Sequence, residues 1–318
     1  MLGVKKRLLR VEMAPDEIAL PKGGFQLPTL TAWLDNQFVP VRSQVEMPPL
    51  GKITLYRTTR EIALKPGRVA EIVDMGYDQL LPLNRRLPRG YDTRDVVYRI
   101  TLQGDKNPAT AFAQDNRQDI TKIDENTIEV HVHDPLGPAA EEKPAPVSEE
   151  YLKSCYFINS GDVRVKEHAK EAVGEETDPL RKALRIEQWV HNHMENQNFT
   201  EAFATADHVA RTLEGDCTEY AVLTAAMCRA AGIPSRAAVG LLYVDMRQGP
   251  VRGPVMGFHM WAEVWIDGRW VPIDATLGRG FVGATHLKIA DNSWYGIQTL
   301  TPLLPVARVL GKMKIEIE

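Results

Sequence analysis

The stretch EGDCTEYAVLTAAMCRAAG, residues 214–232, places a cysteine between acidic residues at the point where an Ala- and Leu-rich segment begins. This composition, with Gly232 at its end and Pro234 close behind, predicts a helix over residues 218–232. Cys217 then lies at the N-terminus of the helix, where unpaired backbone N–H groups and the helix dipole favour negative charge. A thiolate is stabilised in that position, so Cys217 is a candidate nucleophile.

A second stretch, GFHMWAEVWIDGRWVPIDAT (residues 257–276), carries the pattern of a β-hairpin. Asp267 and Gly268 separate two alternating segments, and Asp-Gly between strands is a strong signal for a two-residue turn. That turn makes His259 and Asp274 diagonal neighbours on one face, with Cβ atoms about 7 Å apart or closer, and an imidazole–carboxylate hydrogen bond is expected. The other face is almost purely apolar and is expected to pack against helices or the interior, which leaves open how the thiol approaches.

A thiol nucleophile needs a histidine to take its proton and a third group to orient that histidine. Cys217, His259 and Asp274 provide these three groups in chain order. Of the other two cysteines, Cys228 is expected to be buried and inert, and Cys155 is expected to be a core residue. Cys228 lies inside the predicted helix, and Cys155 stands beside aromatic residues.

Together, GDCTEYAVLTAAMCRAAGIPSRAAVG and the hairpin sequence resemble the core of the transglutaminase-like superfamily, in which a helix-leading Cys, a strand His and a strand Asp follow in this order. The resemblance covers about residues 155–290. It implies an α+β, papain-like fold with the nucleophile helix packed on an antiparallel sheet. It also implies Cys217 as nucleophile, His259 as general base and later acid, and Asp274 as the group that orients the imidazole. Many bacterial members carry a β-rich domain in front and act, or are thought to act, as cysteine proteases or amidases.

The length of 318 residues favours two domains. Segments rich in Val, Ile, Thr and Tyr predict strands and a β-rich N-terminal domain over residues 1–134; they cover residues 52–64, 95–104 and 126–134. The Pro-, Ala- and Glu-rich residues 135–150 are typical of a linker. A catalytic domain is then expected over residues 151–318.

Within this second domain, helical periodicity predicts helices over residues 160–174 and 178–196, with Ser160 and Asp178 as N-caps. Strands are expected to follow the helix that Cys217 leads. They cover residues 235–244, 257–266 and 269–276.

Charge and composition exclude several classes of protein. The formal charge is −4 and no long basic run is present, so no nucleic-acid partner is expected. Three cysteines are too few and too scattered for a disulfide framework or a zinc cluster, and no apolar run approaches the roughly 18 residues that span a bilayer. The N-terminus lacks the apolar region of a signal peptide, so a cytoplasmic location is the default expectation. An extracytoplasmic location stays open if a targeting segment has been removed.

The expected function is cysteine-dependent acyl transfer through a thioester, with hydrolysis of peptide or amide bonds as the outcome and no cofactor or metal. The substrate is then a peptide or protein, and the oligomeric state is not indicated. Two alternatives remain: transamidation between a protein glutamine and an amine, and a binding or scaffold module that does not use its triad. The acidic clusters of the calcium-dependent animal cross-linking enzymes are not found in the sequence.

Further residues have two interpretations each. The backbone N–H of Cys217 is a candidate oxyanion donor, and Gln188 and Trp189 are candidates for the second donor. Glu263 shares the His259 face, where it either tunes the imidazole or, as we expect, is solvated at a strand edge. The aromatic residues of this face either line an acyl-binding groove or cover the sheet; they are Trp261, Trp265 and Trp270. His131 and His133 share a strand face and, with Asp134, are either metal ligands or, as we favour, ordinary side chains.

Overall fold

The computed structural model describes residues 7–14, 18–20, 23–25, 29–47, 51–59, 80–134, 146–196, 203–247, 252–280, 282–309 and 311–318. The chain divides into two compact units, Met1–Met75 and Gly76–Glu318. This division differs from the boundary expected over residues 135–150, of which residues 135–145 lie outside the described ranges.

The first unit contains a four-stranded antiparallel sheet in the order β1-β4-β5-β6. Its strands are β1 (Leu9–Met13), β4 (Leu30–Leu34), β5 (Pro40–Met47) and β6 (Gly51–Tyr56), and β2 (Ile18–Leu20) pairs separately with β3 (Gly23–Phe25). On this sheet the guanidinium of Arg42 lies 4.3 Å from the centre of the Trp33 ring, a cation–π contact. Of the strand predicted over residues 52–64, the part from residue 60 onward lies outside the described residues.

The second unit contains an antiparallel sheet in the order β17-β8-β10-β9. Its strands are β8 (Asp95–Leu102), β9 (Gln118–Lys122), β10 (Thr127–His133) and β17 (Met313–Ile317). Alternate residues of β8 and β10 are buried, as their alternating sequences predict. The C-terminal strand β17 pairs with β8, and the hydroxyl of Tyr98 on β8 donates to the carbonyl of Ala284, 3.0 Å away. These contacts across the chain explain why β8 and β10 belong to the second unit.

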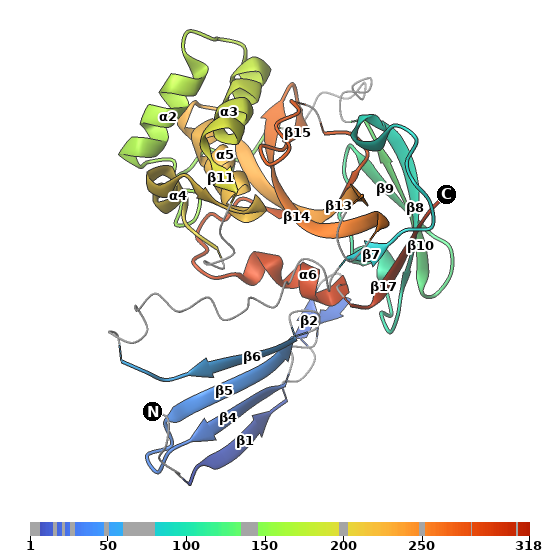
Figure 1. Cartoon of the computed structure of the whole chain (residues 1–318), viewed down its shortest axis with the longest axis vertical. Helices are drawn as coiled ribbons and strands as arrows, with labels where there is room; N and C mark the ends of the chain where they lie inside the picture. Colours follow the sequence, from blue (N-terminus) through green and yellow to red (C-terminus); the bar gives the residue numbers. More distant parts are fainter. Residues whose placement is uncertain are drawn as a thin grey trace. The chain divides into compact units, whose positions relative to one another are not determined.

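The central sheet of the same unit has the order β15-β14-β13-β16, and its strands are all antiparallel. They are β13 (Ser235–Met246), β14 (Gly253–Ile266), β15 (Arg269–Ile273) and β16 (His286–Asn292), and the short β7 (Leu81–Pro82) also pairs with β14. Helices α2 (Val163–Val173), α3 (Pro179–His193), α4 (Ala206–Thr212) and α5 (Cys217–Ala230) gather on one side of β13 and β14, whereas β8, β9, β10 and β17 lie on the other side (Figure 1). The predicted α+β fold, with helices packed on an antiparallel sheet, is confirmed.

Smaller elements complete this unit. A parallel pair joins β11 (Glu195–Asn196) to β12 (Glu214–Gly215), directly before the helix that Cys217 leads. Helix α6 (Leu304–Val309) precedes β17. Within the described residues, no helix combines the length and apolar character needed to span a bilayer.

Helix α5 is the centre of the helical layer. Its residues are buried from Glu219 to Arg229, because α2, α3 and α4 surround it on the sides that the sheet leaves open. Cys228 is fully buried within it, and burial raises the pKa of its thiol, as expected of an inert cysteine. Cys155 is partly buried and packs against the core.

Side-chain caps fix where the helices begin. The carboxylate of Asp178 accepts a hydrogen bond from the backbone N–H of Arg181, which confirms this predicted cap. Helix α2 is capped by Asp162 and not by Ser160, because the Asp162 carboxylate accepts from two backbone N–H groups of the first turn. Helix α5 begins at Cys217, one residue before the predicted start.

Candidate active site

A capping box fixes the N-terminus of α5. The Asp216 carboxylate accepts from the backbone N–H of Thr218 at 2.9 Å, and the Glu219 carboxylate accepts from the backbone N–H of Asp216 at 3.1 Å. Cys217 is therefore the first residue of the helix, and its side chain is partly exposed, in contrast to Cys228. The structure thus places Cys217 at the position where a thiolate gains from the helix N-terminus.

Glu219 also ties a neighbouring segment to this helix end. Its second carboxylate oxygen accepts from the backbone N–H of Ala204 at 2.8 Å, and burial raises the pKa of Glu219. Gly215 has a φ of 152°, and a Cβ at this position would lie 2.3 Å from the Cβ of Glu219. Glycine is required there both by the backbone conformation and by the close approach of Glu219.

The hairpin of β14 and β15 has the predicted register, with Ala262 opposite Ile273 and Ile266 opposite Arg269. The turn residues Asp267 and Gly268 both have positive φ, as a type I′ turn requires. The regular pairing ends at Ile273 and leaves the next residue, Asp274, free to turn toward β14.

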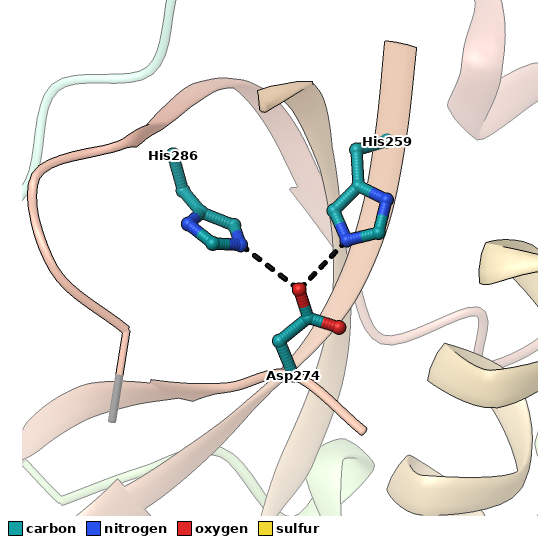
Figure 2. A group of neighbouring side chains, drawn as sticks. All are labelled: His259, Asp274 and His286. Carbon is teal, nitrogen blue, oxygen red and sulfur yellow. Dashed lines mark hydrogen bonds and ion pairs between the residues drawn. The ribbon is translucent and has the colours of Figure 1, made fainter. Parts of the chain in front are cut away.

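At this end of the hairpin, Nε2 of His259 donates to Oδ2 of Asp274 over 2.8 Å (Figure 2). Both side chains are buried, with exposed fractions of 4% for His259 and 2% for Asp274. The imidazole–carboxylate hydrogen bond expected from the register is therefore present. The second ring nitrogen of His259 points away from Asp274 (Figure 2).

The Cys217 side chain lies close enough to the His259 ring to raise the pKa of that imidazole. Because Nε2 is bonded to Asp274, Nδ1 is the nitrogen left to face the thiol. The structure thus brings Cys217, His259 and Asp274 into one chain of contacts. It also answers the question that the sequence left open, since the thiol approaches His259 from the N-terminal end of α5.

Neighbouring charges control the protonation of His259 and Asp274. Burial by itself would lower the pKa of His259, but the charge of the Asp274 carboxylate, the hydrogen bond to it and the nearby Cys217 side chain raise it to about 10. Burial would raise the pKa of Asp274, but His259 and a second histidine, His286, hold it well below its usual range. His259 is therefore an imidazolium at neutral pH, paired with a carboxylate.

This pairing predicts a pH dependence of stability. The pKa of His259 is raised from 6.5 to about 10 in the folded protein. The contribution of its proton to the free energy of unfolding is therefore fully present below pH 6.5 and is lost as the pH rises through 10. The difference in free energy of unfolding between the wild type and His259→Gln should therefore shrink between pH 7 and pH 10, by at most about 1.4 kcal/mol per pH unit. Urea unfolding of both proteins across this range measures it. Parallel curves would contradict the raised pKa.

Part of the chain matches a known protein family. Residues 166–275 match the sequence model of the transglutaminase-like superfamily. The chain contains a transglutaminase-like domain. An uncharacterised protein of Haemophilus influenzae is 30% identical over 146 residues, which cover 40% of this chain and 39% of that protein. The kyphoscoliosis peptidase of Mus musculus is 29% identical over 140 residues, which cover 41% of this chain and 21% of that protein.

The chain thus matches well under half of the length of these two relatives. Among solved structures, a candidate cysteine protease from Cytophaga hutchinsonii is similar, with 17% identity and a TM-score of 0.45 over 71% of this chain and 86% of that chain.

A buried charge network lies on the His259 face of the transglutaminase-like domain. Glu263, expected to be solvated, is only 1% exposed. Its carboxylate accepts from Lys288 Nζ at 3.0 Å and from Arg236 Nε at 2.7 Å. Lys288 also pairs with Asp115 and Asp291. The expectation for Glu263 was wrong because residues 115–118, which precede and begin β9, cover this face of the sheet: the Gln118 side chain bonds both backbone groups of Lys288.

The tryptophans named as candidates have different surroundings. Trp261 is 1% exposed, which fits aromatic cover of the sheet and leaves it no part in an open groove. Trp265 and Trp270 form an edge-to-face pair with ring centres 5.3 Å apart, and the Arg236 guanidinium lies 4.0 Å above Trp270. Trp189 is buried and stacks on His193, and its indole N–H has no hydrogen-bond partner among the described residues.

Two groups of side chains among the described residues have the composition of metal ligands. One is His259, Asp274 and His286, whose candidate ligand atoms lie within 4.8 Å of one another. Nε2 of each of these histidines is already bonded to the Asp274 carboxylate. The other consists of Asp115, Glu263 and Asp291, and the Lys288 ammonium lies among them. Both groups are therefore satisfied by protein atoms.

The histidines of β10 are not brought together with Asp134 as a ligand set. His131 bonds to Asp95 at 2.9 Å, and His133 bonds to Asp119 at 3.2 Å. Asp95 lies on β8 and Asp119 on β9, so each histidine forms an ordinary cross-strand pair with a different neighbour of β10.

Sequence reasoning did not find His286. This histidine begins β16, and its Nε2 donates to Oδ2 of Asp274 over 3.0 Å. The segment THLKIAD around it carries no local pattern that points to Asp274, because the two residues meet only through the pairing of the sheet.

Proposed function

We propose that the transglutaminase-like domain catalyses cysteine-dependent acyl transfer, with hydrolysis of peptide or amide bonds as its main outcome. The observation that carries this proposal is the buried His259–Asp274 hydrogen bond with the Cys217 thiol against the same imidazole. The three groups have the order of contacts that an activated thiol requires: nucleophile, base and orienting carboxylate. The name of the mouse relative, a peptidase, supports peptide bonds as the target.

In the proposed reaction, the Cys217 thiolate attacks the carbonyl carbon of the substrate and forms a tetrahedral adduct. The His259 imidazolium then gives its Nδ1 proton to the departing nitrogen, the C–N bond breaks, and a thioester with a free amine results. His259, now neutral, takes a proton from water as the water oxygen attacks the thioester. When this second adduct collapses, the acid leaves and the thiolate–imidazolium pair is restored.

The proposed reaction also needs hydrogen-bond donors that stabilise the negative oxygen of the tetrahedral adduct. We take the backbone N–H of Cys217, the first residue of α5, as one donor to the negative oxygen of the adduct. For a second donor we favour Trp189 over Gln188, because the indole N–H has no partner among the described residues. The Gln188 amide is exposed and already bonded to Asn192 at 3.2 Å.

Alkylation of Cys217 by iodoacetamide tests the proposal without a known substrate. The rate at pH 7 is measured by mass spectrometry of the peptide that contains Cys217, and Cys228 in the same protein serves as the buried control. We expect rapid alkylation of Cys217 in the wild type and about 30-fold slower alkylation in His259→Ala, because an ordinary thiol is only a few per cent thiolate at pH 7. Equal rates would favour a binding or scaffold module whose triad is idle.

A second assay separates hydrolysis from transamidation. Casein is incubated with the protein and a labelled primary amine, and both peptide release and incorporation of label are followed. Peptide release without incorporation supports hydrolysis. Incorporation of label that is lost in Cys217→Ala would instead establish transfer to an amine.

A further inference from the structure

Asp274 lies between two imidazole rings, those of His259 and His286 (Figure 2). A single oxygen, Oδ2, accepts from both Nε2 atoms, at 2.8 Å from His259 and 3.0 Å from His286. The other oxygen, Oδ1, accepts from the backbone N–H of Thr276 at 3.0 Å. Three donors therefore hold the carboxylate, but only His259 among them also contacts the thiol.

We propose that His286 is a positioning residue that fixes the Asp274 carboxylate, so that His259 keeps a proton on Nε2 and presents Nδ1 to Cys217. This inference rests on the proposed function. His286 acts only through Asp274, since its own second nitrogen faces the hydroxyl of Thr285 at 3.3 Å.

The protonation of His286 suits this role. The side chain is fully buried, and burial, with the positive charges of His259 and Arg117, lowers its pKa to about 4 despite the favourable contact with Asp274. His286 is therefore neutral at pH 7 and carries one ring hydrogen, which is the one donated to Asp274. A neutral donor orients the carboxylate without adding a second cation that would compete with the His259 imidazolium.

The backbone around His286 is held by specific contacts. Its carbonyl accepts from the buried guanidinium of Arg117 at 2.8 Å, and the same nitrogen donates to the carbonyl of Gly283 at 3.0 Å. Strand β13 has a bulge between Val239 and Gly240 where it pairs with β16. A Cβ at Gly240 would lie 2.1 Å from the carbonyl oxygen of Leu287, so glycine allows β16 to approach this closely. The position of His286 is thus determined by the sheet and not by a loop.

The tautomer of His286 in the wild-type protein gives a first test. A nitrogen–proton correlation spectrum of the histidine side chains is recorded between pH 6 and pH 8, and the His286 signals are assigned by their loss in His286→Gln. We expect one neutral tautomer with the hydrogen on Nε2 throughout this range. A hydrogen on Nδ1 alone, a doubly protonated ring, or an Nε2 that carries a metal would each overturn the proposal.

Variants give a second test, with Cys217 alkylation at pH 5 to 9 as the readout. His286→Gln keeps an N–H donor, whereas His286→Leu removes it and is checked for folding by circular dichroism. We expect the Leu variant to react about 10-fold more slowly than the wild type at pH 7 and the Gln variant to recover most of the rate, because small misplacements of a catalytic group are costly. His131→Leu is the matched control, since it removes an exposed histidine that is also bonded to an aspartate.

The outcomes separate the two hypotheses. A Leu variant that is folded and reacts at the wild-type rate overturns the role of His286 while His259→Ala remains slow. If His259→Ala itself reacts at the wild-type rate, the proposed function fails, and the positioning role fails with it. If the Leu variant does not fold, the tautomer measured in the wild type decides.

Discussion

Replacing Asp274 with asparagine is expected to slow alkylation of Cys217 at pH 7 by about 30-fold, almost to the rate of His259→Ala. The Asn amide donates to Nε2 of His259 where the carboxylate accepted, which forces the ring hydrogen onto Nδ1. In that tautomer His259 cannot take the thiol proton, and the imidazolium has lost the charge that raises its pKa. The rate constant is measured on the Cys217 peptide by mass spectrometry.

Asp119→Asn is the matched control, because it changes an exposed aspartate that is also bonded to a histidine, His133. This variant should react at the wild-type rate. An Asp274→Asn protein that is folded and reacts as fast as the control would show that the carboxylate has no influence on the thiol.

Replacing Glu263 with alanine is expected to lower the free energy of unfolding by about 3–5 kcal/mol. Glu263 is 1% exposed and pairs with two buried cations, Lys288 and Arg236. Burial would raise its pKa, but these cations lower it to about 2. Among the described residues, removal of the carboxylate leaves Lys288 with the partly exposed carboxylates of Asp115 and Asp291. Urea unfolding at pH 7 measures the change.

Glu149→Ala serves as the comparison, because Glu149 forms an exposed pair with Lys153. Its urea midpoint should equal that of the wild type. The contribution of Glu263 to the free energy of unfolding should be present above pH 4.5. It should be lost as the pH falls through about 2, as for any carboxylate with a lowered pKa. A loss below about 1 kcal/mol at pH 7 would mean that the network contributes no more than a surface pair.

Local signals in the sequence were sufficient for the hairpin and the nucleophile helix. The Asp267-Gly268 turn sets the register, and the register alone places His259 near Asp274. The position of Cys217 follows from where the helix begins, and the structure moves that start by only one residue. These features depend on neighbours in the chain, which a sequence pattern can describe.

Features that depend on distant segments were not predicted. The alternation in β8 shows that one face is buried, but it cannot show that the C-terminal strand β17 pairs with it and joins it to the second unit. The same limit applies to Glu263, because its partner Lys288 and the covering residue Gln118 are both remote in sequence. His286 reaches Asp274 only because β16 pairs with β13.

The most direct test of the account is a double-mutant comparison of Cys217 alkylation at pH 7 in the wild type, Asp274→Asn, His259→Ala and the double variant. If the three residues act as one unit, either single change already removes the activation, and the double variant should be no slower than His259→Ala. Wild-type rates in both single variants, or slowing in the double variant equal to the product of the two single effects, would contradict the claim that Cys217, His259 and Asp274 work together.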